Sequence, residues 1–167
     1  MDITQKQLKY WLNYDPNTGI FTWINLPSNA VKIGNKAGWQ KKGYCQIRLK
    51  GRLYYSHRLA FLYMIGAFPT DDVDHINGNR TDTTWTNLRA VTSQDNRKNA
   101  AISINNTSGV LGVVWDKRKN MWMAKIGINY KTKFLGYFDD LEMAKYARLS
   151  AEKVHQYHAN HGRVPNA

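Results

Sequence analysis

The chain has 167 residues, and its 24 Lys and Arg against 12 Asp and Glu give a formal net charge of +12, which favours a polyanionic partner, with nucleic acid first among the candidates. The single cysteine, Cys45, excludes an intramolecular disulfide framework and a cysteine-based zinc site. Because no stretch approaches the ~20 apolar residues of a membrane span and the N-terminal stretch lacks the apolar core of a signal peptide, we expect a soluble intracellular protein with no membrane partner.

The N-terminal part of the chain predicts a short helix followed by antiparallel strands. The helix is expected over 3–12, and a turn follows at 15–19, where Pro16 presets φ and Gly19 closes the turn. An apolar strand is expected over 20–23.

Residues 43–55 alternate between apolar and polar side chains around a Lys50-Gly51 turn, which predicts a hairpin. Its polar face can enter a DNA major groove, and a solvated sheet face is an equally good interpretation of the pattern. The apolar face would hold Cys45, Ile47 and Leu49, and the polar face would hold Gln46, Arg48 and Lys50.

The strongly apolar run 57–68 predicts a buried helix that begins with His57 and Arg58. Arg58 could reach a phosphate or pin the segment that follows. A histidine at the edge of the core beside a surface arginine is the more ordinary interpretation of such a pair.

The segment 73–100 is crowded with hydrogen-bonding side chains. It predicts a strand over 73–76, a turn at 77–79, a return strand over 88–91 and a helix with Ser93 as its N-cap. That order of elements can bring Asp74, His75 and Asn96 onto one small concave surface. A carboxylate beside an amide oxygen suits Mg²⁺ or Mn²⁺, and the histidine could accept a proton from water, although an Asp-His pair is usually structural.

The C-terminal part predicts a second unit after a polar linker at 101–108. Strands are expected over 109–116, 121–129 and 132–138, and a helix follows from Asp139, with Glu142 completing the outline of a capping box. The apolar stripe of this helix would be Leu141, Ala144, Ala147, Ala151 and Val154. In the middle strand, Trp122, Ala124, Ile126 and Ile128 would face the helix, and Met123, Lys125 and Gly127 would face outward.

The central segment resembles the HNH nuclease motif, most closely that of phage and intron-encoded homing endonucleases. The resemblance is carried by residues 74–79, 87–89, 91–92 and Asn96, and residues 14–19 and 57–60 fit the N-terminal region of the same family. It implies an HNH nuclease domain over 1–104 with a ββα-metal core at about 72–100.

By this resemblance His75 would be the general base, and Asp74 and Asn96 would hold one Mg²⁺ or Mn²⁺ ion. Asn87, also a catalytic-site residue, would shape the loop that holds His75. Water would attack the phosphorus and leave 5′-phosphate and 3′-hydroxyl ends, and a monomer with one such site would nick. Further contacts to phosphates near the scissile bond are expected from Asn79, Arg80, Arg97 and Arg58.

The C-terminal unit resembles the AP2 DNA-binding domain through residues 112–116, 122–126 and 134–139, over about 107–160. That fold lays a three-stranded sheet in the major groove with a helix behind it. Where plant-type members carry guanine-reading arginines, this chain has Leu111, Val114, Asp116, Gly127 and Thr132, so we expect the sheet to act mainly as an anchor. Phosphate contacts are expected from Lys117, Arg118, Lys119, Lys131 and Lys133, and base or stacking contacts from Trp115 and Lys125.

We therefore expect an α+β protein of two parts that acts as a divalent-metal-dependent DNA endonuclease of homing type. Its partner would be double-stranded DNA, bound by a monomer or an oligomer, in the cytoplasm of a bacterial or phage-infected cell. Two alternatives are a DNA-binding regulator without nuclease activity and an RNA-binding protein.

Overall fold

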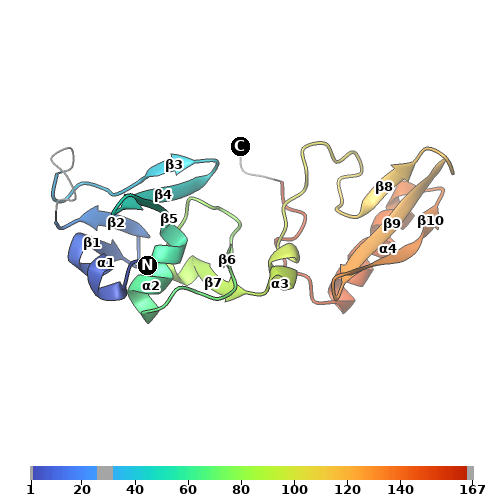
Figure 1. The fold of residues 1–167 in the computed structure, drawn as a ribbon. Coiled ribbons are helices and arrows are strands. Elements are labelled where there is room, and N and C mark those ends of the chain that lie inside the picture. The colour runs from blue at the N-terminus through green and yellow to red at the C-terminus, as the bar shows by residue number, and fades with distance from the viewer. Residues whose placement is uncertain (1, 26–31, 165–167) are drawn as a thin grey trace. The chain divides into compact units, whose positions relative to one another are not determined.

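The computed structural model describes residues 2–25 and 32–164, and the chain divides into two compact units, Met1–Thr92 and Ser93–Ala167 (Figure 1). The fold is mixed α and β, and every strand pair in the described part of the chain is antiparallel. The predicted boundary at 104–107 falls inside the second unit. No helix among the described residues is both long and apolar enough to cross a membrane.

The first unit begins with α1 (Gln5–Trp11), which Thr4 and Gln7 close at its N-terminus in a reciprocal capping box. The predicted helix extended to residue 12, but Leu12 has extended backbone and starts β1 (Leu12–Asp15). Strand β1 pairs with β2 (Ile20–Trp23) across the predicted turn, where the Gly19 N–H donates to the Asp15 carbonyl at 2.8 Å.

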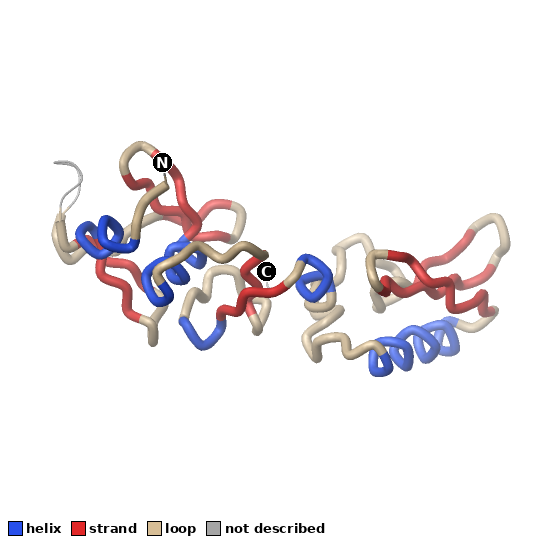
Figure 2. Tube along the Cα trace, turned by 60° about the horizontal axis from the view of Figure 1, so that its bottom comes forward, coloured by secondary structure: helices blue, strands red, loops and turns tan. Residues whose placement is uncertain are grey.

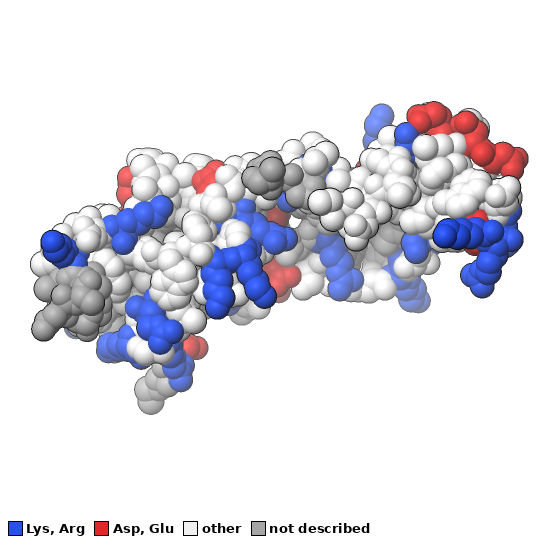
Figure 3. Space-filling view, turned by 90° about the horizontal axis from the view of Figure 1, so that it is seen from above, with Lys and Arg blue, Asp and Glu red and all other residues white. Residues whose placement is uncertain are grey.

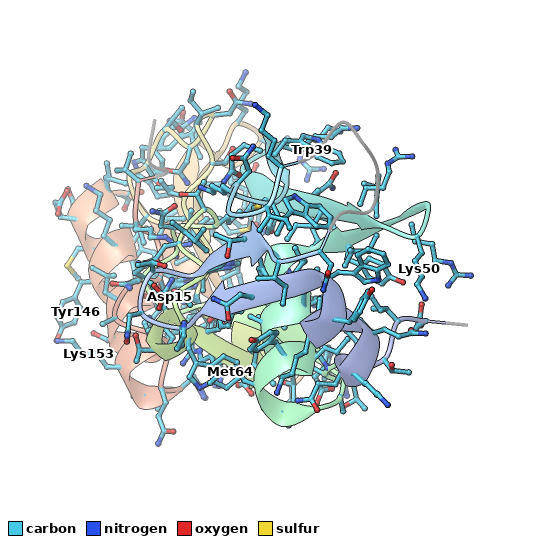
Figure 4. All side chains as sticks on the ribbon, turned by 90° about the vertical axis from the view of Figure 1, so that its left-hand side faces the viewer. Asp15, Trp39, Lys50, Met64, Tyr146 and Lys153 are labelled. Atoms are coloured by element: carbon cyan, nitrogen blue, oxygen red, sulfur yellow. The ribbon has the colours of Figure 1, made fainter. Side chains whose placement is uncertain are left out.

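A three-stranded sheet follows, made of β3 (Trp39–Lys41), β4 (Tyr44–Leu49) and β5 (Arg52–Tyr55). The predicted hairpin is confirmed, because β4 and β5 pair around a two-residue Lys50-Gly51 turn, and Cys45, Ile47 and Leu49 are buried. Figure 4 shows Lys50 projecting from the end of this hairpin and Trp39 on the neighbouring strand.

Helix α2 (Ser56–Ile65) ends earlier than the predicted helix over 57–68, which is a correction. Gly66 takes a left-handed conformation with φ of 93° and its N–H donates to the Leu62 carbonyl, so the backbone leaves the helix there. The helix packs into the core of the first unit, whose most buried large side chains are Leu8, Leu12, Phe21, Ile47, Leu49 and Leu59.

The segment that carries the HNH-like residues folds as β6 (Asp72–His75), the short 3₁₀ helix η1 (Trp85–Asn87) and β7 (Leu88–Val91). Strands β6 and β7 form a two-stranded sheet with His75 opposite Leu88. The expected strand, loop and return strand are therefore present, with the first strand ending at His75 rather than residue 76.

The second unit contains α3 (Ser93–Arg97), the sheet β8 (Val113–Asp116), β9 (Met121–Ile128) and β10 (Lys131–Phe138), and α4 (Leu141–Val154). The strand order is β10-β9-β8, and α4 lies along one face of the sheet (Figure 2). Strand β8 begins later than the predicted strand over 109–116. The predicted cap was also wrong by one residue, since Asp140 rather than Asp139 accepts from the Met143 N–H, at 2.9 Å.

The chain from Lys98 into the predicted linker at 101–108 is tied to the C-terminal segment of the second unit. The N–H groups of His158 and Gly162 donate to the carbonyls of Lys98 and Ala100, at 3.1 and 2.8 Å. The Ile102 N–H donates to the Arg163 carbonyl at 2.9 Å. These backbone hydrogen bonds hold the two segments side by side.

A buried ionic cluster holds the C-terminal segment against α4. Arg148 is 3% exposed, and its Nε donates to the Leu111 carbonyl at 2.8 Å. Its Nη2 lies 3.1 Å from Glu152 Oε1 and 3.2 Å from His161 Nε2. Burial and the Arg148 charge lower the pKa of His161 to about 4, so this ring is neutral at pH 7.

Candidate active site and nucleic-acid surfaces

His75 closes β6 and is 4% exposed. Its ring meets the His57 ring edge-on at 5.1 Å between centroids and lies 6.3 Å from the Tyr44 ring. Burial lowers the pKa of His75, and the charges of Asp74 and Asp82 oppose that shift. The imidazole is therefore neutral at pH 7 and able to accept a proton.

Asn87 braces the loop between β6 and β7 at its start and at its middle. Its Oδ1 accepts from the Asn77 N–H at 2.9 Å, and its Nδ2 donates to the Asp82 carbonyl at 2.9 Å. Its backbone carbonyl accepts from the Ile76 N–H at 2.9 Å. The side-chain amide thus bonds backbone on both sides of the loop that follows His75.

The other polar side chains of this loop form local turns. Asp82 Oδ1 accepts from the N–H and the hydroxyl of Thr84 at 3.1 and 2.8 Å, and Asp82 Oδ2 accepts from Asn77 Nδ2 at 2.7 Å. Burial raises the pKa of Asp82, but these hydrogen bonds and the His75 charge outweigh it, so the pKa is lowered. Asn79 Oδ1 accepts from the N–H and the hydroxyl of Thr81, so Asn79 shapes the loop as well.

The same loop docks on the turn between β1 and β2. The Tyr14 hydroxyl donates to the Thr83 carbonyl at 2.6 Å, and the Thr83 hydroxyl donates to the Gly19 carbonyl at 2.7 Å. The Trp85 N–H donates to the Pro16 carbonyl at 2.9 Å. A Cβ on Gly19 would lie 2.3 Å from the Thr83 carbonyl carbon, so only glycine allows this approach.

Asp74 is 6% exposed and forms an ion pair with Arg89, which faces it across the β6–β7 ladder. Arg89 was not predicted as a site residue. The antiparallel register of the two predicted strands was the signal that could have revealed it, because cross-strand neighbours share a face.

The donor chemistry of the predicted ligands fits a hard divalent cation. Asp74 offers a carboxylate in the first unit, and Asn96 offers an amide oxygen from α3 in the second unit. Among residues 2–25 and 32–164 there is no group of three or more His, Cys, Asp or Glu side chains that could hold a metal ion. A carboxylate and an amide oxygen are donors that Mg²⁺ accepts, and this ion commonly completes its shell with waters and substrate phosphates.

Two of the predicted phosphate-binding arginines lie in the first unit. Arg80 is exposed, and its guanidinium lies over the Tyr44 ring at 5.1 Å. Arg58 is directed instead at the loop after α2, where it donates to the carbonyls of Pro69 and Asp71 at 2.9 and 3.4 Å. Arg58 therefore pins the chain that leads into β6.

The outer face of the β3–β4–β5 sheet carries the predicted DNA-contacting residues Gln46 and Arg48, with Lys50 in the hairpin turn. The register also places Trp39 and Tyr55 on either side of Gln46, and both aromatic side chains are exposed. Trp39 was not predicted because the sequence pattern did not indicate β3. Tyr55 was not predicted either, although it lies in the predicted hairpin, whose register places it opposite Gln46. Figure 3 shows Lys and Arg side chains spread over one face of the first unit.

In the second unit, Lys117, Arg118 and Lys119 are exposed in the turn between β8 and β9. Lys125 points outward from β9 opposite the exposed Phe134. Arg97 of α3 lies over the Tyr130 ring at 5.8 Å.

The register separates the remaining predicted residues of this sheet from Lys125. Trp115 pairs with Trp122, and strand alternation puts both on the face toward α4. Lys131 and Lys133 stand opposite Ile128 and Ile126, which also belong to that face. Two aromatics of the outward face, Phe134 and Tyr137, were missed because a register shift between Phe134 and Gly136 breaks the alternation of β10.

The central segment of the chain is similar to a known family. Residues 54–98 match the family model described as HNH endonuclease. The matched range includes His57, Asp74, His75, Asn87 and Asn96.

Two individual proteins are similar to parts of the chain. Protein 3.8 of Escherichia phage T7 is 29% identical over 83 residues, which are 50% of this chain and 69% of the phage protein. A solved structure described as "DNA binding and cleavage by the HNH homing endonuclease I-HmuI" has 29% identity and a TM-score of 0.41. That match covers 55% of this chain and 53% of the other, so this chain spans about half the length of the solved protein.

Proposed function

We propose that this protein is a divalent-metal-dependent DNA endonuclease of homing type that hydrolyses phosphodiester bonds. The observation that carries the proposal is the setting of His75, a buried neutral imidazole at a strand end, held by an Asn87-braced loop within the range that matches the HNH family. The basic surface and the phage relative agree with a role on phage or bacterial DNA.

In the proposed reaction His75 removes a proton from the attacking water. The water oxygen bonds to phosphorus, the bond from phosphorus to O3′ breaks, and the leaving oxygen takes a proton from solvent. The products are a 5′-phosphate and a 3′-hydroxyl. A neutral His75 is needed at the start, which its burial provides.

Asp74 and Asn96 are the proposed ligands of one Mg²⁺ or Mn²⁺ ion, which would supply positive charge to stabilise the phosphate and the leaving oxygen. Arg89 orients the Asp74 carboxylate through the ion pair across the β6–β7 ladder. Arg80 is the proposed phosphate contact, because it is exposed and lies beside the same cluster of rings as His75.

DNA binding is proposed for two surfaces. One is the outer face of the β3–β4–β5 sheet with Gln46, Arg48 and Lys50. The other is the second unit, which we propose acts as an AP2-like anchor through the turn residues 117–119 and the outward Lys125. These contacts are mainly to phosphates, so affinity should fall steeply as the salt concentration rises.

The proposal is tested with supercoiled plasmids that carry fragments of phage and host genomes, incubated with the protein and Mg²⁺ or Mn²⁺. EDTA and His75→Ala should both abolish conversion to open circle or linear DNA, and His155→Ala serves as a histidine control outside the range that matches the HNH family model. Ligase should reseal nicked products, because their ends would be 5′-phosphate and 3′-hydroxyl.

DNA that is bound in gel shifts but never cut with either metal would overturn the nuclease proposal and favour a DNA-binding regulator. Preferential binding of RNA in competition would favour the RNA-binding alternative. Open circles as the first product would indicate that one strand is cut at a time.

A further inference from the structure

Four rings meet where the β3–β4–β5 sheet approaches the candidate active site. The Tyr44 centroid lies 5.4 Å from Tyr55, 5.6 Å from His57 and 6.3 Å from His75. His57 stacks on Tyr55 at 5.4 Å and meets His75 edge-on at 5.1 Å. Tyr44 and His57 thus each approach all of the other three rings, and Tyr44 is the member of the cluster that the sheet supplies from β4.

Tyr44 also makes a cation–π contact with an arginine side chain. The Arg80 guanidinium lies over its ring at 5.1 Å, a geometry in which the ring quadrupole attracts the positive charge. Arg80 belongs to the loop after β6, whereas Tyr44 belongs to β4, directly after the β3–β4 turn. One side chain of the sheet therefore contacts both the proposed general base and the proposed phosphate-binding arginine.

His57 completes this arrangement as a neutral ring. Burial, His75 and Arg58 lower the pKa of His57 to about 3. Its Nδ1 is buried and has no hydrogen-bond partner within the described part of the chain. His57 therefore meets His75 as a neutral ring, and the rings of His57 and Tyr44 both lie against the His75 imidazole.

We propose that Tyr44 is a positioning residue of the nuclease site, whose ring fixes the orientation of the His75 imidazole and keeps the Arg80 guanidinium beside it. This inference rests on the proposed function, because it assigns a role in that reaction. Each ring contact is weak, but a misplacement of about 1 Å at a reacting group can cost about 100-fold in rate.

The experiment compares three variants of the full chain. Tyr44→Leu removes the ring, and Tyr44→Phe keeps the ring without the hydroxyl. Tyr54→Leu is the matched control, since Tyr54 is a half-buried tyrosine of the adjacent strand β5 that stacks on Phe68 at 6.0 Å. Circular dichroism and thermal unfolding establish that each variant is folded.

Three readouts are recorded for each variant. The first is DNA affinity by gel shift in EDTA, and the second is the single-turnover cleavage rate at saturating DNA with Mn²⁺. The third is the ¹H–¹³C NMR signal of the His75 and His57 rings in metal-free protein, assigned among the five histidines by single substitutions.

We expect Tyr44→Leu to shift both histidine signals and to lower the cleavage rate by about 10-fold or more, with DNA affinity changed by less than about threefold. Tyr44→Phe and Tyr54→Leu should cleave like the wild type. Unchanged His75 signals in Tyr44→Leu would overturn the inference, as would a loss of affinity with the rate at saturation unchanged.

Failure of the proposed function has a separate signature. If the wild-type protein binds DNA without cutting it, the nuclease proposal falls, and the assignment of Tyr44 to that reaction falls with it. If the wild type cuts and Tyr44→Leu cuts equally fast, the nuclease proposal stands and the inference is wrong.

Discussion

Arg89 donates both Nε and Nη2 to a single oxygen of Asp74, Oδ2, at 2.9 and 2.7 Å. The carboxylate is nearly buried, whereas the arginine side chain is 34% exposed. Charge-assisted hydrogen bonds of this kind are stronger than neutral ones, and they fix the direction in which the carboxylate points. The orientation of a proposed metal ligand is thus set by its cross-strand neighbour.

Replacement of Arg89 by Ala should therefore lower both stability and activity. Loss of the two donors to a buried carboxylate should reduce the free energy of unfolding by about 1–3 kcal/mol, measured by urea denaturation. The cleavage rate should fall by about 10–100-fold, as for other groups that orient metal ligands. Arg52→Ala is the control, because its ion pair with Asp2 is exposed and should be worth less than about 1 kcal/mol. Equal costs for the two variants would contradict this account.

Asn87→Ala should release the loop that follows His75. The variant loses an acceptor for the Asn77 N–H and a donor to the Asp82 carbonyl, which should cost about 1–3 kcal/mol of unfolding free energy. Cleavage should fall by about 100-fold, because the loop beside the general base is no longer fixed. Asn13→Ala removes an exposed asparagine that accepts one hydrogen bond from Tyr63, and it should cleave normally. An Asn87→Ala protein with wild-type stability would refute the bracing role.

Gly19→Ala should displace the loop that follows His75, although Gly19 lies in the turn between β1 and β2. Its backbone has φ of +71°, and the new Cβ would lie 2.3 Å from the Thr83 carbonyl carbon, so the loop at 76–87 must shift. Gly34→Ala is a close control, with φ of +85° and open space around the Cβ. The control should cost about 1–2 kcal/mol for the left-handed backbone alone. Thermal unfolding should show a clearly larger loss for Gly19→Ala, and similar losses would show that the close contact with Thr83 is unimportant.

The second unit should lose stability in mild acid through His161. Its pKa in the folded protein is about 4, against 6.5 for an exposed histidine, so the unfolded chain binds the proton first. This contribution is fully present above pH 6.5 and is lost as the pH falls toward 4, by about 1–3 kcal/mol in total. Arg148 and Arg163 oppose protonation of His161, whereas the Lys98 backbone favours it.

The pH effect is measured as unfolding free energy between pH 7 and pH 4 for wild type and His161→Gln. Glu152 works in the opposite direction, because burial raises its pKa and folding then favours its protonated form as the pH falls. The comparison isolates the histidine, since both proteins retain Glu152. A wild-type curve that parallels the variant across this range would show that His161 does not titrate as described.

The elements that were predicted correctly are those whose local signals agree with their packing. The β4–β5 hairpin has strict alternation and a Lys50-Gly51 turn, so its register could be predicted from the sequence. The bracing of the loop by Asn87 follows from its place before a return strand, and the hydrogen bonds confirm that geometry. Its role in the reaction stays a prediction.

The elements that were missed lack a local signal. Strand β3 has three residues that are all exposed, so no alternation between apolar and polar side chains indicates it. Strand β1 follows α1 without a break, and Leu12 both caps the helix and starts the strand. The pairing of the predicted linker with the C-terminal segment depends on backbone hydrogen bonds, which side-chain patterns do not reveal.

The contacts of Thr83 with the turn between β1 and β2 also bear on the order of folding. They join residues separated by 69 and 64 positions in the chain. Because long-range contacts of this kind carry a large loop-closure entropy, they form late, after most of the first unit has become compact. The β1–β2 hairpin precedes this loop in the chain and pairs residues that are close in sequence. We therefore expect it to act as a template on which the nuclease loop orders late, so that the capacity to cut DNA appears only after the fold around it is complete.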